Sequence, residues 1–147
     1  MFLQLTWRLP RVAATVSMPR RALDSVLKSL GVTAECRGDL MLALNEACAN
    51  AVEHARHGGE YRVTITADPH RCAVEIVDCG VGMIDERRFR RDVVPPASLR
   101  GRGIAIIRAC TDSLDLTAVD PHGLAVRFSK RLVWEPGARD RLLAPAA

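Results

Sequence analysis

The sequence lacks any long apolar run, and this limits the cellular locations that we expect for the protein. No stretch reaches the roughly 18 to 20 apolar residues that a membrane-spanning helix needs. The N-terminal segment MFLQLTWRLPR has too short an apolar stretch for a secretory signal. We therefore expect a cytoplasmic protein that has no membrane partner.

The five cysteines lack the spacing of a redox or metal-binding motif. They form no CxxC pair, and the four histidines do not stand at ligand spacing from them, which argues against a zinc site. We expect small buried thiols in a reducing compartment. These cysteines are Cys36, Cys48, Cys72, Cys79 and Cys110, of which Cys79 falls within a glycine-containing loop.

Lysine and aromatic residues are both scarce. Of 21 basic residues only Lys28 and Lys130 are lysines, and aromatic residues make up 4% of the chain. The net charge of +4 raises nucleic acid as a partner, but so few aromatic side chains can hardly build a stacking platform for single strands. The arginine run over residues 87–91 is interpreted as a solvated face or a phosphate-facing lid. We expect no direct contact with nucleic acid.

The chain has the size and patterning of a single domain. Its 147 residues are 48% hydrophobic, which is enough for one buried core. We expect one domain over residues 1–134, followed by a flexible tail over residues 135–147 that is rich in proline and alanine.

The periodicity of apolar residues predicts an α+β domain. Strands are weakly indicated over 3–8 and 12–17; helices are indicated over 19–30, 33–56 and 101–110, and strands over 61–67, 72–78, 114–119 and 124–131. Pro19, Gly31 and Thr33 supply helix start and stop signals. The order predicts a two-layer α/β sandwich, with helices on one face of a mixed, mainly antiparallel sheet.

The segment LMLALNEACANAVEHA carries the first group of candidate functional residues. Glu46 and Asn50 are four residues apart, so their side chains lie on one face of a helix. An amide oxygen beside a carboxylate suits Mg²⁺, which takes few protein ligands, and Glu46 could instead act as a general base. Taken alone, the pair is more typical of a solvated helix surface.

The segment VEIVDCGVGM carries the second group. A strand that ends in Asp78 runs into Gly80 and Gly82, which permit a tight turn and a close approach of the backbone to a ligand. Asp78 could accept a hydrogen bond from the exocyclic amine of adenine. A simple turn that closes a hairpin remains the alternative.

The segment LRGRGIAIIRAC carries the third group. Gly101 and Gly103 precede an apolar helix, whose free N–H groups and positive dipole end can bind an anion. Arg100 and Arg102 flank the glycines and could contact phosphate oxygens. The lysine and hydroxyl residue of a Walker A loop are absent, and one GxG before a helix is weak evidence.

The three groups together, within about 60 residues and in this order, resemble the nucleotide-binding fold shared by gyrase, Hsp90, histidine kinases and MutL, the GHKL superfamily with its Bergerat-type fold. Within that superfamily the chain most resembles the anti-sigma-factor serine/threonine kinases of the RsbW and SpoIIAB type. The resemblance covers about residues 12–132, nearly the whole chain.

The resemblance implies a role for each matched residue. NEACANAVEHA resembles the N-box, so Asn50 would bind Mg²⁺ and Glu46 would be the catalytic base. VDCGVGM and GRGIAIIR resemble the two glycine boxes, which would bind adenine and cradle the phosphates of ATP. Residues 84–99 would form a short lid. The residues implied to bind ATP are Asn50, Asp78, Gly80, Gly82, Met83, Arg100, Gly101, Arg102, Gly103 and Ile104.

The resemblance also implies partners and an activity. We expect a kinase that phosphorylates a serine or threonine of an anti-anti-sigma (STAS-type) protein and thereby controls a sigma factor, with a homodimer as a possible state. Members commonly carry a small hydroxyl residue after the glycine of the last hairpin, whereas Leu124 follows Gly123 here. A binding module that uses nucleotide only as a conformational ligand is therefore the alternative. A histidine-kinase fragment is disfavoured because no phosphoacceptor helix is recognisable.

Overall fold

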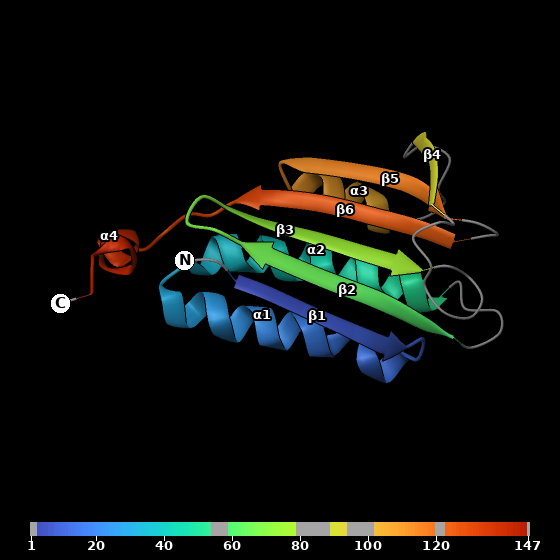
Figure 1. The fold of residues 1–147 in the computed structure, drawn as a ribbon, viewed down its shortest axis with the longest axis horizontal. Coiled ribbons are helices and arrows are strands. Elements are labelled where there is room, and N and C mark those ends of the chain that lie inside the picture. Colours follow the sequence, from blue (N-terminus) through green and yellow to red (C-terminus); the bar gives the residue numbers. More distant parts are fainter. Residues whose placement is uncertain (1–2, 54–58, 79–88, 94–101, 120–122, 147) are drawn as a thin grey trace.

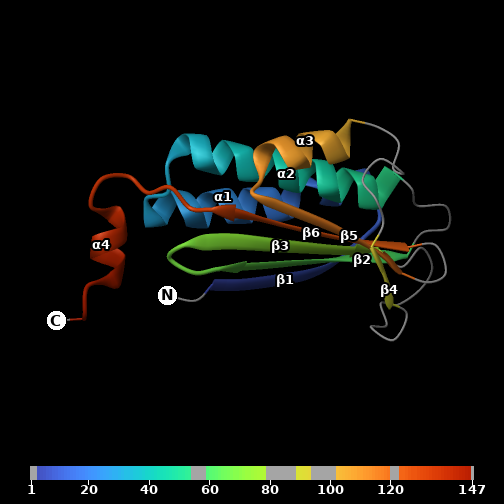
Figure 2. The same ribbon diagram turned by 90° about the horizontal axis from the view of Figure 1, so that it is seen from above.

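The computed structural model describes residues 3–53, 59–78, 89–93, 102–119 and 123–146. In these residues one sheet carries three helices, α1, α2 and α3, on the same face (Figure 1). Seen from above, a fourth helix lies beyond the end of the sheet (Figure 2). The two-layer α+β arrangement that the sequence predicts is confirmed.

The sheet has six strands in the order β1-β2-β3-β6-β5-β4. Each neighbouring pair is antiparallel, so the described part of the sheet contains no parallel pair of strands. The strands are β1 (Leu3–Pro10), β2 (Glu60–Ala67), β3 (Arg71–Asp78), β4 (Phe89–Val93), β5 (Ser113–Val119) and β6 (Gly123–Arg131).

Alternation along the strands separates a buried face from an open one. In β2 the side chains of Tyr61, Val63 and Ile65 are fully buried, while the residues between them are only partly covered. The buried residues join the apolar stripes of the helices in one core. Four described cysteines are free and buried there, as predicted; Cys79 lies outside the described residues.

Four helices are described, and all but the last begin and end close to where the sequence predicts. They are α1 (Ser17–Leu30), α2 (Ala34–Glu53), α3 (Gly103–Cys110) and α4 (Ala138–Leu143). Gly31 ends α1 with a φ of 88°, a conformation that glycine adopts without strain. Thr33 caps α2, because its Oγ1 accepts the Cys36 N–H at 3.4 Å. None of the described helices is long and apolar enough to cross a membrane.

The prediction of a strand over residues 12–17 is wrong. The segment instead forms a 3-10 turn, η1 (Ala13–Thr15), and the first residue of α1. The Thr15 hydroxyl contacts the carbonyl oxygens of Pro10 at 2.9 Å and Val12 at 2.8 Å, and the hydroxyl of Tyr61 at 2.9 Å. The two local bonds satisfy backbone carbonyl groups without strand pairing, and the contact with Tyr61 ties the turn to β2.

The segment expected to be a flexible tail contains α4 and packs on the domain. The Trp134 indole donates to the carbonyl oxygen of Pro69 at 2.9 Å, and the Glu135 N–H donates to that of Gly31 at 2.8 Å. Ala138 is buried against Gly31. The pattern of proline and alanine gave no sign of these contacts, because they depend on residues far away in the sequence.

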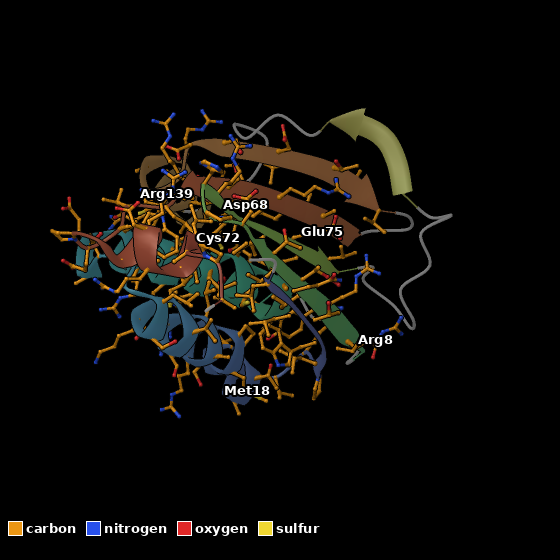
Figure 3. The ribbon with its side chains drawn as sticks, turned by 60° about the vertical axis from the view of Figure 1, so that its left-hand side comes forward. Arg8, Met18, Asp68, Cys72, Glu75 and Arg139 are labelled. Carbon is orange, nitrogen blue, oxygen red and sulfur yellow. The ribbon has the colours of Figure 1, made fainter. Side chains whose placement is uncertain are left out.

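The turn between β2 and β3 lies at the same end of the molecule as α4. Figure 3 shows Asp68, Cys72 and Arg139 together there, with Arg8 at the far end. Asp68 Oδ1 accepts the N–H groups of His70 at 2.7 Å and Arg71 at 2.9 Å, which lower the pKa of the Asp68 carboxyl below its usual range. These two hydrogen bonds hold the turn between β2 and β3.

Candidate nucleotide site

Three element ends meet at the end of the molecule opposite α4. The C-terminal ends of α2 and β3 and the N-terminal end of α3 lie there together in both views (Figure 1, Figure 2). These three ends carry the described members of the predicted site. The structure therefore gathers residues that lie up to about 60 positions apart in the sequence.

Glu46 and Asn50 lie on α2 and face the first residue of α3. A Cβ atom built on Gly103 would stand 3.2 Å from Glu46 Oε2 and 3.2 Å from Asn50 Oδ1. Glycine is therefore the residue that lets α3 approach these two polar groups without displacing them. Both side chains are partly exposed, so a ligand can reach them.

The start of α3 presents backbone donors at this point. The N–H of Ile106 donates to the Arg102 carbonyl oxygen at 2.9 Å, and the N–H groups that precede it lie at the open end of the helix. Arg102 is exposed, and its side chain makes no capping hydrogen bond. The Ile104 side chain is buried in the core, so this residue can contribute only its backbone N–H to a phosphate.

Asp78 is the last residue of β3 and is buried, with a relative exposure of 7%. Its Oδ2 accepts a hydrogen bond from Arg11 Nη2 at 3.2 Å. The Arg11 side chain is 1% exposed, and its Nε donates to the carbonyl oxygen of Ala51 on α2 at 3.0 Å. Arg11 therefore links the strand that carries Asp78 to the last turns of the helix that carries Asn50.

Arg11 was missed by the sequence reasoning. It directly follows β1, and the strand register places Leu9 opposite Tyr61 and Tyr61 opposite Asp78. This register across three strands carries Arg11 to the end of β3. A lone arginine after a proline gives no local signal of such a contact.

Several other predicted residues lie outside the described part of the chain. Gly80, Gly82, Met83, Arg100 and Gly101 belong to this group, so their predicted roles stay predictions. Of the arginine run over residues 87–91, residues 87 and 88 lie outside it as well, and residues 89–91 belong to β4.

The described residues fit a magnesium ion that is shared with phosphates. Among residues 3–53, 59–78, 89–93, 102–119 and 123–146, no group of three or more acidic, histidine or cysteine side chains could hold a metal ion. Mg²⁺ does not need such a group, because it keeps several waters and takes one or two protein oxygens besides those of phosphates. Asn50 Oδ1, beside the Glu46 carboxylate and the start of α3, offers that donor set.

The open face of the sheet carries a separate polar hollow. Its volume is about 280 Å³, and Glu75, labelled in Figure 3, lies in its lining. Glu75 bridges Arg62 at 3.2 Å and Arg127 at 2.6 Å, so these three charges are already paired. The hollow shares no residue with the site at the ends of α2, β3 and α3.

Comparison with known proteins identifies the family. Residues 9–130 match the family described as histidine kinase-like ATPase domain. The chain belongs to this family of ATPase domains. The match includes every candidate site residue, and the observed fold is of the GHKL type.

The relatives of the chain include an anti-sigma factor and serine-protein kinases. The chain is 27% identical over 120 residues to an anti-sigma F factor from Pasteuria penetrans, covering 77% of this chain and 80% of that protein. It is 27% identical over 138 residues to the serine-protein kinase RsbW of Bacillus pumilus, covering 85% and 83%. A Mycobacterium tuberculosis structure with RsbU and RsbW domains matches with a TM-score of 0.60 at 17% identity, covering 88% of this chain and 32% of that one. That last likeness shows the fold alone.

Proposed function

We propose that the chain is an ATP-dependent protein kinase of the anti-sigma-factor type. It transfers the γ-phosphoryl group of ATP to a serine or threonine of an anti-anti-sigma (STAS-type) partner and thereby controls a sigma factor. The observation that carries the proposal is the approach of Gly103 to Glu46 and Asn50, which sets a phosphate-binding helix end against a carboxylate and an amide oxygen. Membership of the ATPase family and the names of its relatives support it.

The site residues have distinct tasks in this proposal. The N–H groups of Gly103 and Ile104 bind phosphate oxygens, and Arg102 adds a positive charge. Asn50 Oδ1 would hold Mg²⁺, which would neutralise charge on the phosphates. Asp78 accepts a hydrogen bond from the adenine amine. Positioning and electrostatics supply most of the rate enhancement of such transfers.

Glu46 acts as the general base. Its carboxylate accepts the proton of the attacking serine or threonine hydroxyl while the oxygen of that hydroxyl bonds to the γ-phosphorus. The bond between the γ-phosphorus and the bridging oxygen breaks, and ADP leaves with that oxygen. Glu46 is partly exposed on the side of α2 that faces Gly103, so a partner's hydroxyl can reach it.

The proposal also covers location and assembly. We place the protein in the cytoplasm, where ATP and sigma factors are present, and give it no direct role in nucleic-acid binding. A homodimer follows from the resemblance to anti-sigma-factor kinases.

The test substitutes Glu46 by glutamine. Glu46→Gln is expected to bind Mg-ATP like the parent and to lose phosphotransfer to a STAS-type protein, followed with radiolabelled ATP. Glu35→Gln is the matched control, because Glu35 lies in the first turn of the same helix, at its other end. If Glu46→Gln transfers phosphate as fast as Glu35→Gln does, the base assignment is wrong. If the parent binds ATP but transfers nothing, the non-catalytic binding module replaces the kinase.

A further inference from the structure

The buried ion pair between Arg11 and Asp78 is not explained by packing alone. A guanidinium that is 1% exposed costs much desolvation, which is offset only when its donors have good partners. Arg11 directs Nη2 to Asp78 on β3 and Nε to the Ala51 carbonyl on α2. One side chain therefore holds two of the three element ends that form the site.

Asp78 keeps a small exposed fraction despite this contact. Its side chain is 10% exposed, so it is not completely enclosed. A carboxylate can accept several hydrogen bonds at once, so the bond from Arg11 does not use up its capacity. The guanidinium fixes the direction of the remaining acceptor sites, because a planar donor that is also bonded to α2 cannot follow a rotating carboxylate.

We infer that Arg11 is a positioning residue that sets the selectivity of this site for adenine over guanine. The inference rests on the proposed binding of ATP and deepens it. Adenine presents an amine donor where guanine presents a carbonyl acceptor. A fixed carboxylate accepts from the first and repels the second, and Arg11 acts by holding Asp78 in that orientation.

The residue opposite Asp78 on β6 bears on the role of Arg11. In the β3–β6 register Leu124 lies directly opposite Asp78. A leucine side chain cannot donate a hydrogen bond to the carboxylate. Arg11 reaches Asp78 from the side of β1 and supplies a donor.

The experiment is a double-mutant cycle read by calorimetry with Mg-ATP and Mg-GTP. The four proteins are the parent, Arg11→Met, Asp78→Asn and the double variant; methionine keeps the length of the side chain without its charge. We expect Arg11→Met to weaken ATP roughly tenfold and to reduce the ratio of ATP to GTP affinity. In the Asp78→Asn background the same change should alter ATP affinity less than about twofold, because Arg11 acts through Asp78.

A control separates this effect from a general loss of charge. Arg8→Met removes an arginine that pairs with Glu60 at 3.3 Å and is 48% exposed, and it should leave both affinities unchanged. Two results would show that Arg11 is only structural and would overturn the inference. In one, Arg11→Met weakens ATP binding and GTP binding by equal factors. In the other, it weakens ATP binding by the same factor in the parent and in the Asp78→Asn background. If the parent binds neither ATP nor GTP, both the proposed ATP-dependent function and this inference fail. That outcome is distinct from the two above, in which the parent does bind nucleotide.

A second variant covers the case in which Arg11→Met does not fold, as judged by its thermal unfolding. Arg11→Lys keeps the charge, but one ammonium group cannot reproduce the fork that reaches both Asp78 and Ala51. We expect Arg11→Lys to fold and to show a lower ratio of ATP to GTP affinity than the parent. A lysine variant with the parent's ATP affinity and the parent's ratio would overturn the inference.

Discussion

Substitution of Gly103 by alanine tests the contact on which the proposed site depends. The new Cβ would stand 3.2 Å from Glu46 Oε2, 3.2 Å from Asn50 Oδ1 and 3.3 Å from Asn50 Nδ2. These distances are shorter than ordinary van der Waals contacts, so the two side chains must shift by a few tenths of an ångström. The backbone at Gly103 does not have a positive φ, so alanine causes no strain there.

The expected effect falls on binding and spares stability. Alanine gains up to about 1 kcal/mol in helix propensity over glycine, which offsets the cost of the tight contacts. A shifted Asn50 loses one contact with a charged ligand, and such a contact contributes about 1.5 to 3 kcal/mol. Mg-ATP should therefore bind about ten- to a hundredfold more weakly, with little change in the free energy of unfolding.

The assay pairs calorimetry of Mg-ATP binding with urea unfolding, and the control is Gly38→Ala. Gly38 is an exposed residue inside α2, and a Cβ built on it meets nothing within 4 Å. Gly38→Ala should stabilise the protein by about 0.4 to 1 kcal/mol and leave ATP affinity unchanged. If Gly103→Ala binds Mg-ATP as tightly as Gly38→Ala does, the start of α3 is not part of the nucleotide site.

Three further predictions concern the fold. Gly31→Ala should destabilise the protein by at least about 1 kcal/mol in urea unfolding, because the new Cβ would stand 2.5 Å from Ala138 Cβ at a φ of 88°. Burial raises the pKa of the Cys48 and Cys72 thiols to about 12, so iodoacetamide at pH 8 should label them only after unfolding; labelling of the folded protein would contradict their burial. Because the pKa of Asp68 is lowered in the folded protein, its carboxylate stabilises the fold at pH values above the usual carboxyl pKa. This stabilisation is lost as the pH falls through the pKa of Asp68 in the folded protein. The destabilisation caused by Asp68→Ala should therefore shrink between pH 6 and pH 2, and a constant loss would refute this.

Local signals in the sequence predicted much of the fold. Gly31 and Thr33 ended one helix and capped the next as expected, because their effects depend on neighbouring backbone groups alone. The strand predicted over residues 61–67 is observed as β2 for the same reason. The layering of helices on one face followed from the order of these elements.

The parts that were missed depend on contacts between distant residues. Arg11 reaches Asp78 through the register of three strands, which no local pattern encodes. The position of α4 depends on Trp134 and on the fit of Ala138 against Gly31. Of the candidate site, the spacing of Glu46 and Asn50 predicted their shared helix face, but not that α3 would begin against them.

The measurement that tests the central claim most directly is calorimetry of Mg-ATP with the parent, Asn50→Ala and Asp78→Asn. We expect saturable binding of Mg-ATP by the parent, weakened about tenfold or more by each substitution. Asn50→Ala removes a magnesium ligand, and Asp78→Asn changes the acceptor for the adenine amine. Binding that neither substitution weakens would place the nucleotide elsewhere. No binding by the parent would contradict an ATP-dependent function.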